Sequence, residues 1–282
     1  MAEHSGAAKS AKKNYLSRSW ALLTSEKGWY KPILVFAAVF CIPVAGPILG
    51  TLGLIGYSLE WARLTAWGID AVPKQRNVNI GGCLGSGWRG FWVRTCWGLL
   101  FGLALGLLQL LLSMLFLMPL AFVLGLLSVI VGAVGLAASL RAAIYEKFGA
   151  GFGFSQLWQM IRRDTDGFFT IVGVQLLGGI IIGAVGMVVA MLTLGRIIPS
   201  LMPYVTILQQ GNATGMDALN IVDSIMQVFL GMSPVLAVVG FVVRLVSVVF
   251  ELLSCTVAGL WMRQFDVASW GAPSDPLPAE EA

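Results

Sequence analysis

The chain has 282 residues, of which 57% are hydrophobic and 11% are charged, whereas about 25% of the residues of an average soluble domain are charged. Several uncharged stretches exceed the ~20 apolar residues that a helix needs to cross a bilayer, which excludes a soluble globular protein and predicts an all-α integral membrane protein with several crossings. The net charge of +4 comes from basic residues scattered between apolar runs, where they mark membrane topology, so no nucleic-acid partner is expected.

The chain divides into three predicted segments. Residues 1–28 form a basic tail with room for one interfacial helix, residues 29–265 form a single membrane domain, and residues 266–282 form a Pro-rich, acidic tail whose composition is typical of disorder. Within the membrane domain, four runs are free or nearly free of charge: 32–59, 95–140, 167–195 and 233–262. The second run is long enough for two crossings with a turn near Pro119, and the third and fourth runs hold one crossing each.

The first run is long for one crossing and short for two. Its centre, CIPVAGPILG, places Pro43 and Pro47 on either side of Gly46. Proline inside a helix removes a backbone hydrogen bond and clashes with the preceding turn, whereas the first position of a helix tolerates it. The run is therefore predicted to bend into two short helices, which form either a full hairpin or a re-entrant pair.

The distribution of lysine and arginine selects this hairpin. If the first run returns to its starting side, sixteen of the 18 Lys and Arg residues, Arg94 among them, lie on the side of the two termini, and only Arg196 and Arg244 lie on the other. If the run crosses once, the division falls to ten against eight. Because positive charge concentrates on the cytoplasmic side, we expect a multi-pass protein of the cell membrane with both termini in the cytoplasm. It would consist of three helical hairpins, the first short or re-entrant and followed by four full crossings.

Each hairpin ends in a charged, aromatic stretch that closes on glycine: EWARLTAWG, RAAIYEKFG and WMRQFDVASWG. Two explanations remain open. Any cytoplasmic helix end favours aromatic and cationic side chains at the level of the lipid headgroups, or the chain contains a threefold repeat.

Two further segments are predicted to be interfacial amphipathic helices. Residues 154–166 place Phe154, Leu157, Trp158 and Ile161 on one helical face and polar side chains elsewhere, which is typical of a helix that lies on the inner leaflet. Residues 216–230 also combine a polar with an apolar face. They lie within 196–233, the one sizeable segment expected outside the cytoplasm.

The stretch IPVAGPILGTLGLIGYSLEWARLTAWG, the pair Val72-Pro73, and the later LRAAIYEKFGAGFGFSQLWQMIRRDTDGFF resemble a family of prokaryotic membrane proteins, domain-of-unknown-function family four thousand and thirteen. The similarity covers roughly residues 19–265. The chain departs from the family after Pro73, where KQRNVN stands in place of an acidic-aromatic segment. The resemblance implies a prokaryotic membrane fold, and it implies no particular chemistry because the family has no assigned activity.

Glycines recur at helical spacing on three predicted faces. Such faces let helix backbones approach closely in lipid, where hydrophobicity itself does not drive association. Packing inside the chain is the expected role, and self-association through an exposed face is the alternative. The glycines are Gly46, Gly50, Gly53 and Gly56 on the first face, Gly98, Gly102 and Gly106 on the second, and Gly179 and Gly183 on the third.

Glu251 is the ionisable residue predicted to lie deepest in the membrane. It precedes Arg263, which marks the cytoplasmic end of the last crossing, by about 18 Å of helix, whereas Arg244 lies near the opposite boundary and can extend its side chain outward. A carboxylate at that depth needs a partner or a proton, and the expected partners are Gln175 and Arg244. Glu251 either fastens helices together, in which case Glu251→Gln should preserve folding, or serves as a proton or cation site in a transport path.

The sequence contains none of the motifs of a hydrolase, a metalloprotease or a phosphate-binding loop. The four cysteines show no paired spacing and the single histidine lies in the N-terminal tail, so neither a metal nor another cofactor is expected. We therefore expect a non-enzymatic membrane protein that organises lipid or binds partners, which include membrane lipids and either a second copy or another membrane protein. The alternative is a small transporter or channel that uses Glu251.

Overall fold

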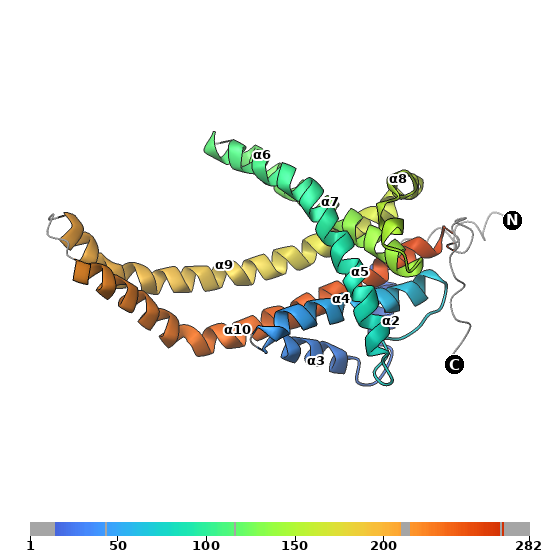
Figure 1. The fold of residues 1–282 in the computed structure, drawn as a ribbon, viewed down its shortest axis with the longest axis horizontal. Coiled ribbons are helices and arrows are strands. Elements are labelled where there is room, and N and C mark those ends of the chain that lie inside the picture. The colour runs from blue at the N-terminus through green and yellow to red at the C-terminus, as the bar shows by residue number, and fades with distance from the viewer. Residues whose placement is uncertain (1–14, 43, 116, 210–214, 266, 268–282) are drawn as a thin grey trace. The chain divides into compact units, whose positions relative to one another are not determined.

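The computed structural model describes residues 15–42, 44–115, 117–209, 215–265 and 267, and every regular element in them is a helix (Figure 1). The α-helices are α2 (Tyr15–Thr24), α3 (Tyr30–Phe40), α4 (Ala45–Ala66), α5 (Ile80–Trp97), α6 (Leu103–Met114), α7 (Met118–Ile144), α8 (Phe154–Arg163), α9 (Thr165–Gln209) and α10 (Gly215–Arg263). A π-helical turn, η1 (Gly98–Gly102), joins α5 to α6, and a 3₁₀ helix, η2 (Phe148–Phe152), precedes α8.

Four helical stretches in the described residues are long and apolar enough to cross a membrane: Ile80–Met114, Val123–Ile144, Thr165–Pro199 and Leu230–Arg263. They coincide with the four crossings predicted from the apolar runs. The chain is therefore an all-α membrane protein, as its composition indicated. The described part of its basic tail forms helix α2, in which Ser19 and Leu23 are buried.

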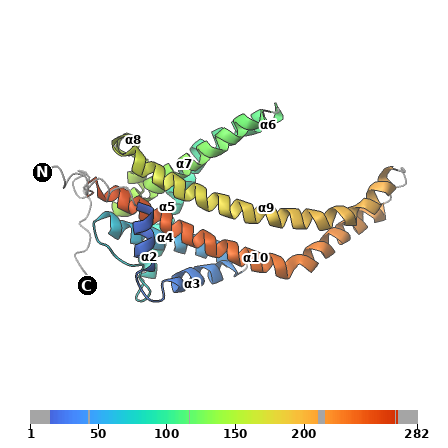
Figure 2. The ribbon, with the colours of Figure 1, turned by 180° about the vertical axis from the view of Figure 1, so that it is seen from behind.

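The first apolar run is broken into two helices, as predicted. Helix α3 ends at Phe40 and α4 begins at Ala45, and Val44 between them has a left-handed φ of 64°. The two helices lie side by side (Figures 1 and 2), and the rings of Phe36 and Tyr57 are 5.4 Å apart. With 11 residues, α3 is ~16 Å long, about half of the ~30 Å hydrocarbon thickness. This length fits a re-entrant pair better than a full hairpin.

The second run forms two long helices. The continuous stretch α5–η1–α6 ends at Met114, and α7 begins at Met118 with a proline in its first turn. The turn therefore lies just before Pro119, where the sequence placed it. Leu105 and Leu112 of α6 pack against Leu124 of α7.

The last two helices are longer than predicted. Helix α9 has 45 residues and α10 has 49, or ~68 and ~74 Å of helix. The segment 196–233 was expected to lie outside the cytoplasm with an amphipathic helix over 216–230. Residues 216–230 are helical, but they form the beginning of α10, and Arg196 lies inside α9. Each helix continues through a proline, Pro199 in α9 and Pro234 in α10, although proline in a helix interior removes a backbone hydrogen bond.

The chain divides into two compact units. Unit 1 comprises Met1–Leu177 with Val248–Ala282, and unit 2 comprises Gly178–Ser247. The core of unit 1 is formed by α4, α5, α7 and the C-terminal part of α10, which supply the fully buried side chains Leu59, Val93, Leu140 and Trp261. The boundary between the two units falls inside the 29–265 segment that was predicted from the sequence to be one membrane domain.

Glycine allows α4 and α5 to touch along their backbones. A Cβ at Gly56 would overlap the carbonyl group of Cys83, and a Cβ at Gly87 would overlap that of Leu52. Between α4 and α10, a Cβ at Gly259 would crowd the carbonyl of Ala62. These close approaches hold the helices of unit 1 near enough for short polar side chains to meet.

Ion pairs connect the charged helix ends of unit 1. Arg63 Nη1, in the last turn of α4, lies 2.8 Å from Glu146 Oε1, which follows α7. Asp70 Oδ1 accepts hydrogen bonds of 2.9 Å from both Arg18 and Arg263. The stretches EWARLTAWG and RAAIYEKFG therefore contact each other through Arg63 and Glu146. Asp70 links Arg263, in the third such stretch, to α2.

The side chain of Asp164, the residue directly before α9, forms further contacts in unit 1. Its Oδ1 accepts the backbone N–H of Gly167 at 3.1 Å, and its Oδ2 accepts the Tyr15 hydroxyl at 3.4 Å and the Gln264 amide. Burial, together with the nearby Asp164 charge, raises the pKa of Tyr15 to about 12. Helix α2 is thereby attached to the start of α9 and the end of α10.

Candidate functional sites

Glu251 forms an ion pair in the core of unit 1. Arg94 Nη1 of α5 donates a 2.6 Å hydrogen bond to Glu251 Oε1 of α10, and the two side chains are 22% and 23% exposed. Both residues lie within the apolar spans Ile80–Met114 and Leu230–Arg263. Glu251 therefore has a polar partner in the helix bundle, and this partner is Arg94, whereas Gln175 and Arg244 were the partners expected from the sequence.

Short polar side chains from the neighbouring helices complete a small network around this pair. The Ser58 hydroxyl of α4 and the Cys255 thiol of α10 donate to Glu251 Oε1 at 3.5 and 3.4 Å. Arg94 Nε donates to Ser139 Oγ of α7 at 3.1 Å, and Arg94 Nη2 reaches Cys255 Sγ at 3.4 Å. Each of the four core helices of unit 1 contributes to this polar cluster, which consists of Ser58, Arg94, Ser139, Glu251 and Cys255.

The polar cluster connects neighbouring helices through an ion pair and hydrogen bonds. The opposite charges of Arg94 and Glu251 compensate each other, and the remaining donors point at oxygen or sulfur atoms of adjacent helices. Compensation and hydrogen bonding are what make a buried charge tolerable.

Sequence reasoning missed Arg94 because it placed the start of the second crossing at residue 95. Helix α5 actually begins at Ile80, where the Asn79 side chain accepts the backbone N–H of Gly82 at 3.0 Å. Arg94 thus lies fourteen residues into the helix and faces the core. A helical projection of 80–97 would have placed it on the face of the buried residues Gly87, Gly90 and Val93.

The two partners proposed from the sequence occupy other places. Gln175 of α9 lines a cavity of about 330 Å³ in unit 1, to which Arg94 also contributes. Arg244 belongs to unit 2. The structure therefore brings Gln175 and Arg94 to one cavity and assigns the ion pair to Arg94.

The predicted glycine faces have different surroundings. Gly46, Gly50 and Gly53 pack against α3, and Gly56 packs against α5, so the first face acts inside the chain. A Cβ at Gly98, Gly102 or Gly106 would meet no other atom within 4 Å, and Gly98 and Gly102 line the 330 Å³ cavity instead. Within unit 2, Gly179 and Gly183 are open in the same way.

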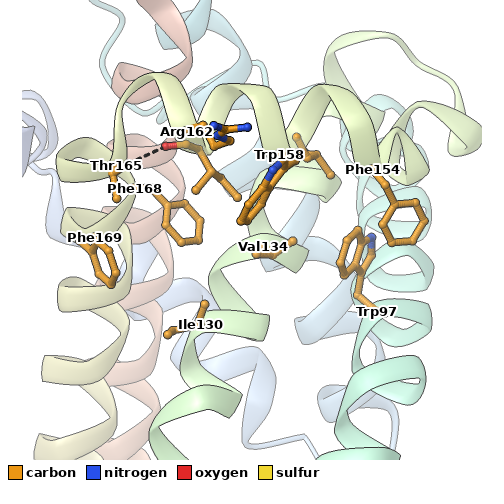
Figure 3. Close-up of a pocket in the computed structure, with 11 residues that line it drawn as sticks. Trp97, Ile130, Val134, Phe154, Trp158, Arg162, Thr165, Phe168 and Phe169 are labelled. Carbon is orange, nitrogen blue, oxygen red and sulfur yellow. Dashed lines mark hydrogen bonds between the residues drawn. The ribbon is translucent and has the colours of Figure 1, made fainter.

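A larger cavity of about 580 Å³ lies beneath α8 (Figure 3). Helix α8 supplies one wall with the four side chains that the sequence placed on its apolar face, together with Arg162. Ile130 and Val134 of α7 form the back, and aromatic rings close the two ends (Figure 3). The complete lining is Trp97, Ile130, Val134, Phe154, Leu157, Trp158, Ile161, Arg162, Thr165, Phe168 and Phe169.

The polar atoms of the α8 cavity are mostly engaged with the protein. Trp97 Nε1 donates to the Gly151 carbonyl at 3.2 Å, and the hydroxyl of Thr165 donates to the Ile161 carbonyl at 3.0 Å. The Trp97 ring lies 4.8 Å from the ring of Phe154 and so presents an aromatic surface. The cavity is therefore apolar inside, with the Arg162 guanidinium as its charged group.

Helix α8 is tied to α7 by a buried arginine. Arg141 Nη2 donates to Gln156 Oε1 at 2.9 Å, and its Nη1 lies 3.8 Å from Met160 Sδ. Leu157 and Met160 are buried, whereas Phe154 and Trp158 are 49% and 61% exposed. One side of α8 thus packs on the bundle, and its aromatic residues remain available at the edge of the cavity.

The sequence of the chain matches one model of a protein family. Residues 38–194, more than half of the chain, match the model described as "Protein of unknown function (DUF4013)". The chain belongs to this family. The DUF4013 match includes Ser58, Arg94, Ser139 and all of α8, and it ends before Glu251 and Cys255. The match is shorter than the 19–265 similarity estimated from the motifs, and searches of curated proteins and of solved structures found no match.

Proposed function

We propose that this DUF4013 protein is a non-enzymatic protein of the cell membrane that binds and organises lipid, with both termini in the cytoplasm. The observation that carries the proposal is the apolar cavity of about 580 Å³ beneath the amphipathic helix α8. Its size is within the ~300–1,000 Å³ range of ligand pockets. Because the chain is a membrane protein, hydrocarbon chains of lipids are the apolar molecules present at the highest concentration around it.

The position of α8 supports a role at the membrane surface. Amphipathic helices with aromatic residues on one face and arginine on the other bind at the boundary between headgroups and acyl chains. Phe154 and Trp158 are exposed on the aromatic side, and the basic last turn contains Arg162 and Arg163. Placing this helix at the inner leaflet agrees with the excess of positive charge on the side of the termini.

The polar cluster supports a structural role for Glu251 within the same proposal. A proton-carrying site works through gain and loss of charge, whereas the charge of Glu251 is matched by a guanidinium 2.6 Å away. An arginine stays protonated at all physiological pH values. The pair therefore serves to hold α5 and α10 together around the lipid-binding region.

The proposal is tested by returning lipid to the purified protein. Protein extracted in a mild detergent and stripped of lipid should gain thermal stability when a bacterial polar lipid extract is added, because a ligand that binds the native state stabilises it. Native mass spectrometry of gently extracted protein should also detect bound phospholipid. Absence of both bound phospholipid and stabilisation would refute lipid binding.

A second copy or another membrane protein is a further partner within this proposal. The glycine face formed by Gly98, Gly102 and Gly106 meets no atom that would obstruct a Cβ, and open glycine faces allow close helix contacts in lipid. Size-exclusion chromatography with light scattering should show whether Gly102→Leu changes the oligomeric state. An unchanged state would remove this face as a contact between copies.

Transport is the second candidate, favoured by the cavity of about 330 Å³ that Arg94 and Gln175 line between apolar spans. In proteoliposomes containing a pH-sensitive dye, a proton-coupled carrier should move protons in response to a membrane potential. Glu251→Gln should then abolish this flux when equal amounts of folded protein are reconstituted. A flux no greater than that of empty liposomes would dismiss the transport function.

A further inference from the structure

We infer that the α8 cavity holds one acyl chain of an anionic phospholipid, whose phosphate is bound by Arg162. The inference rests on the proposed lipid binding and specifies its site and its ligand. The lining of the cavity determines the apolar part of the ligand. Apart from Arg162 and the internally bonded Thr165, the side chains that line it are aliphatic or aromatic.

The shape of the cavity fits a chain and not a headgroup. Trp97 and Phe154 stand at one end, Phe168 and Phe169 stand at the other, and Ile130 forms part of the back (Figure 3). A phosphate group placed among these rings would lose its hydration without gaining hydrogen bonds, which is costly. A hydrocarbon chain has no polar group to desolvate, and its entry removes apolar surface from water, which offsets the cost of ordering the chain.

Arg162 supplies the complementary charge at the rim. Its side chain is exposed, and among the described residues it has neither an ion-pair nor a hydrogen-bond partner. Arginine binds phosphate oxygens through two parallel N–H groups. The free guanidinium therefore stands where the phosphate of a lipid would lie if its chain occupied the cavity.

The neighbouring arginine has a different environment and provides a matched control. Arg163 lies one residue away on α8, but its guanidinium lies 6.0 Å from the centre of the Phe265 ring, and it is not part of the cavity lining. Removing either charge changes the net charge of α8 equally. Only the removal of the Arg162 charge should change lipid binding at the cavity.

Trp158 connects the two parts of the site. Its ring lines the cavity and is 61% exposed. Tryptophan favours the headgroup level of a membrane because its ring is apolar while its N–H can donate a hydrogen bond. In this position, the ring covers the upper part of the bound chain and leaves Arg162 in contact with the headgroup region.

The test is native mass spectrometry of the full-length protein, stripped of lipid and then titrated with palmitoyl-oleoyl phosphatidylglycerol or phosphatidylcholine. The wild type should retain one phosphatidylglycerol molecule more strongly than phosphatidylcholine. Arg162→Gln should weaken phosphatidylglycerol binding about fivefold, since one cation at an anionic lipid surface contributes about that factor. Arg163→Gln should bind both lipids like the wild type.

A second variant tests the cavity itself. Ile130→Trp fills the back of the cavity and should abolish retention of the single lipid, whereas Leu127→Trp, on the exposed part of α7 outside the lining, should leave it unchanged. Equal retention by Ile130→Trp and wild type would overturn the site while leaving lipid binding elsewhere intact. Equal effects of Arg162→Gln and Arg163→Gln would overturn the role of Arg162. Absence of any retained lipid in the wild type would instead refute the proposed function.

Discussion

The ion pair between Arg94 and Glu251 predicts the stability of variants that lack one of the two partners. Removing one partner of a buried ion pair costs about 3–5 kcal/mol, because the other charge remains uncompensated. Both side chains are slightly more than one-fifth exposed, so we expect the lower end of this range. Glu251→Gln and Arg94→Gln should each reduce the free energy of unfolding by about 3 kcal/mol at neutral pH.

The assay is unfolding in sodium dodecyl sulfate, followed by tryptophan fluorescence in a mild detergent. The double variant Arg94→Gln/Glu251→Gln completes a cycle, and its cost should be below the sum of the single costs by at least about 1 kcal/mol, since the residues are in contact. Additive costs, or a Glu251→Gln variant as stable as the wild type, would refute the fastening role. From the sequence alone Glu251→Gln was expected to preserve folding, and the charge of Arg94 reverses that expectation.

Three further predictions follow from the geometry of unit 1. Cys41, at the tip of the α3–α4 pair, should remain unlabelled by an impermeant maleimide in intact cells, because α3 is too short to cross; labelling from outside would show a full hairpin. Gly87→Ala should destabilise the protein by about 1–3 kcal/mol through overpacking, whereas Gly85→Ala, whose Cβ meets nothing within 4 Å, should be neutral or slightly stabilising; equal effects would contradict the close approach of α4 and α5. The raised pKa of Tyr15, about 12, means that its contribution is complete below about pH 10 and is lost as the pH rises toward 12; ultraviolet titration of Asp164→Asn should show this ionisation move to lower pH while staying above the ordinary tyrosine value, because burial is the larger cause of the shift.

The sequence by itself determined the class of the protein and the number of its long apolar helices. The reason is that crossing a bilayer requires long uncharged stretches, which can be counted without knowing any contact. The break between α3 and α4 was equally visible, because proline disrupts a helix through its own covalent structure. The apolar face of α8 followed from helical periodicity alone, and its four side chains all line the same cavity.

Only the tertiary structure decided which groups meet. The partner of Glu251 is 157 residues away in the sequence, and Arg94 was assigned to the cytoplasmic boundary because the second crossing was taken to start at residue 95. Likewise, glycines at the same spacing pack tightly in α4 and are open in α6. Spacing shows that a helix has a smooth face. How distant segments pack together decides whether that face has a neighbour, whether an acid has a counter-charge and whether a cavity lies beneath a helix.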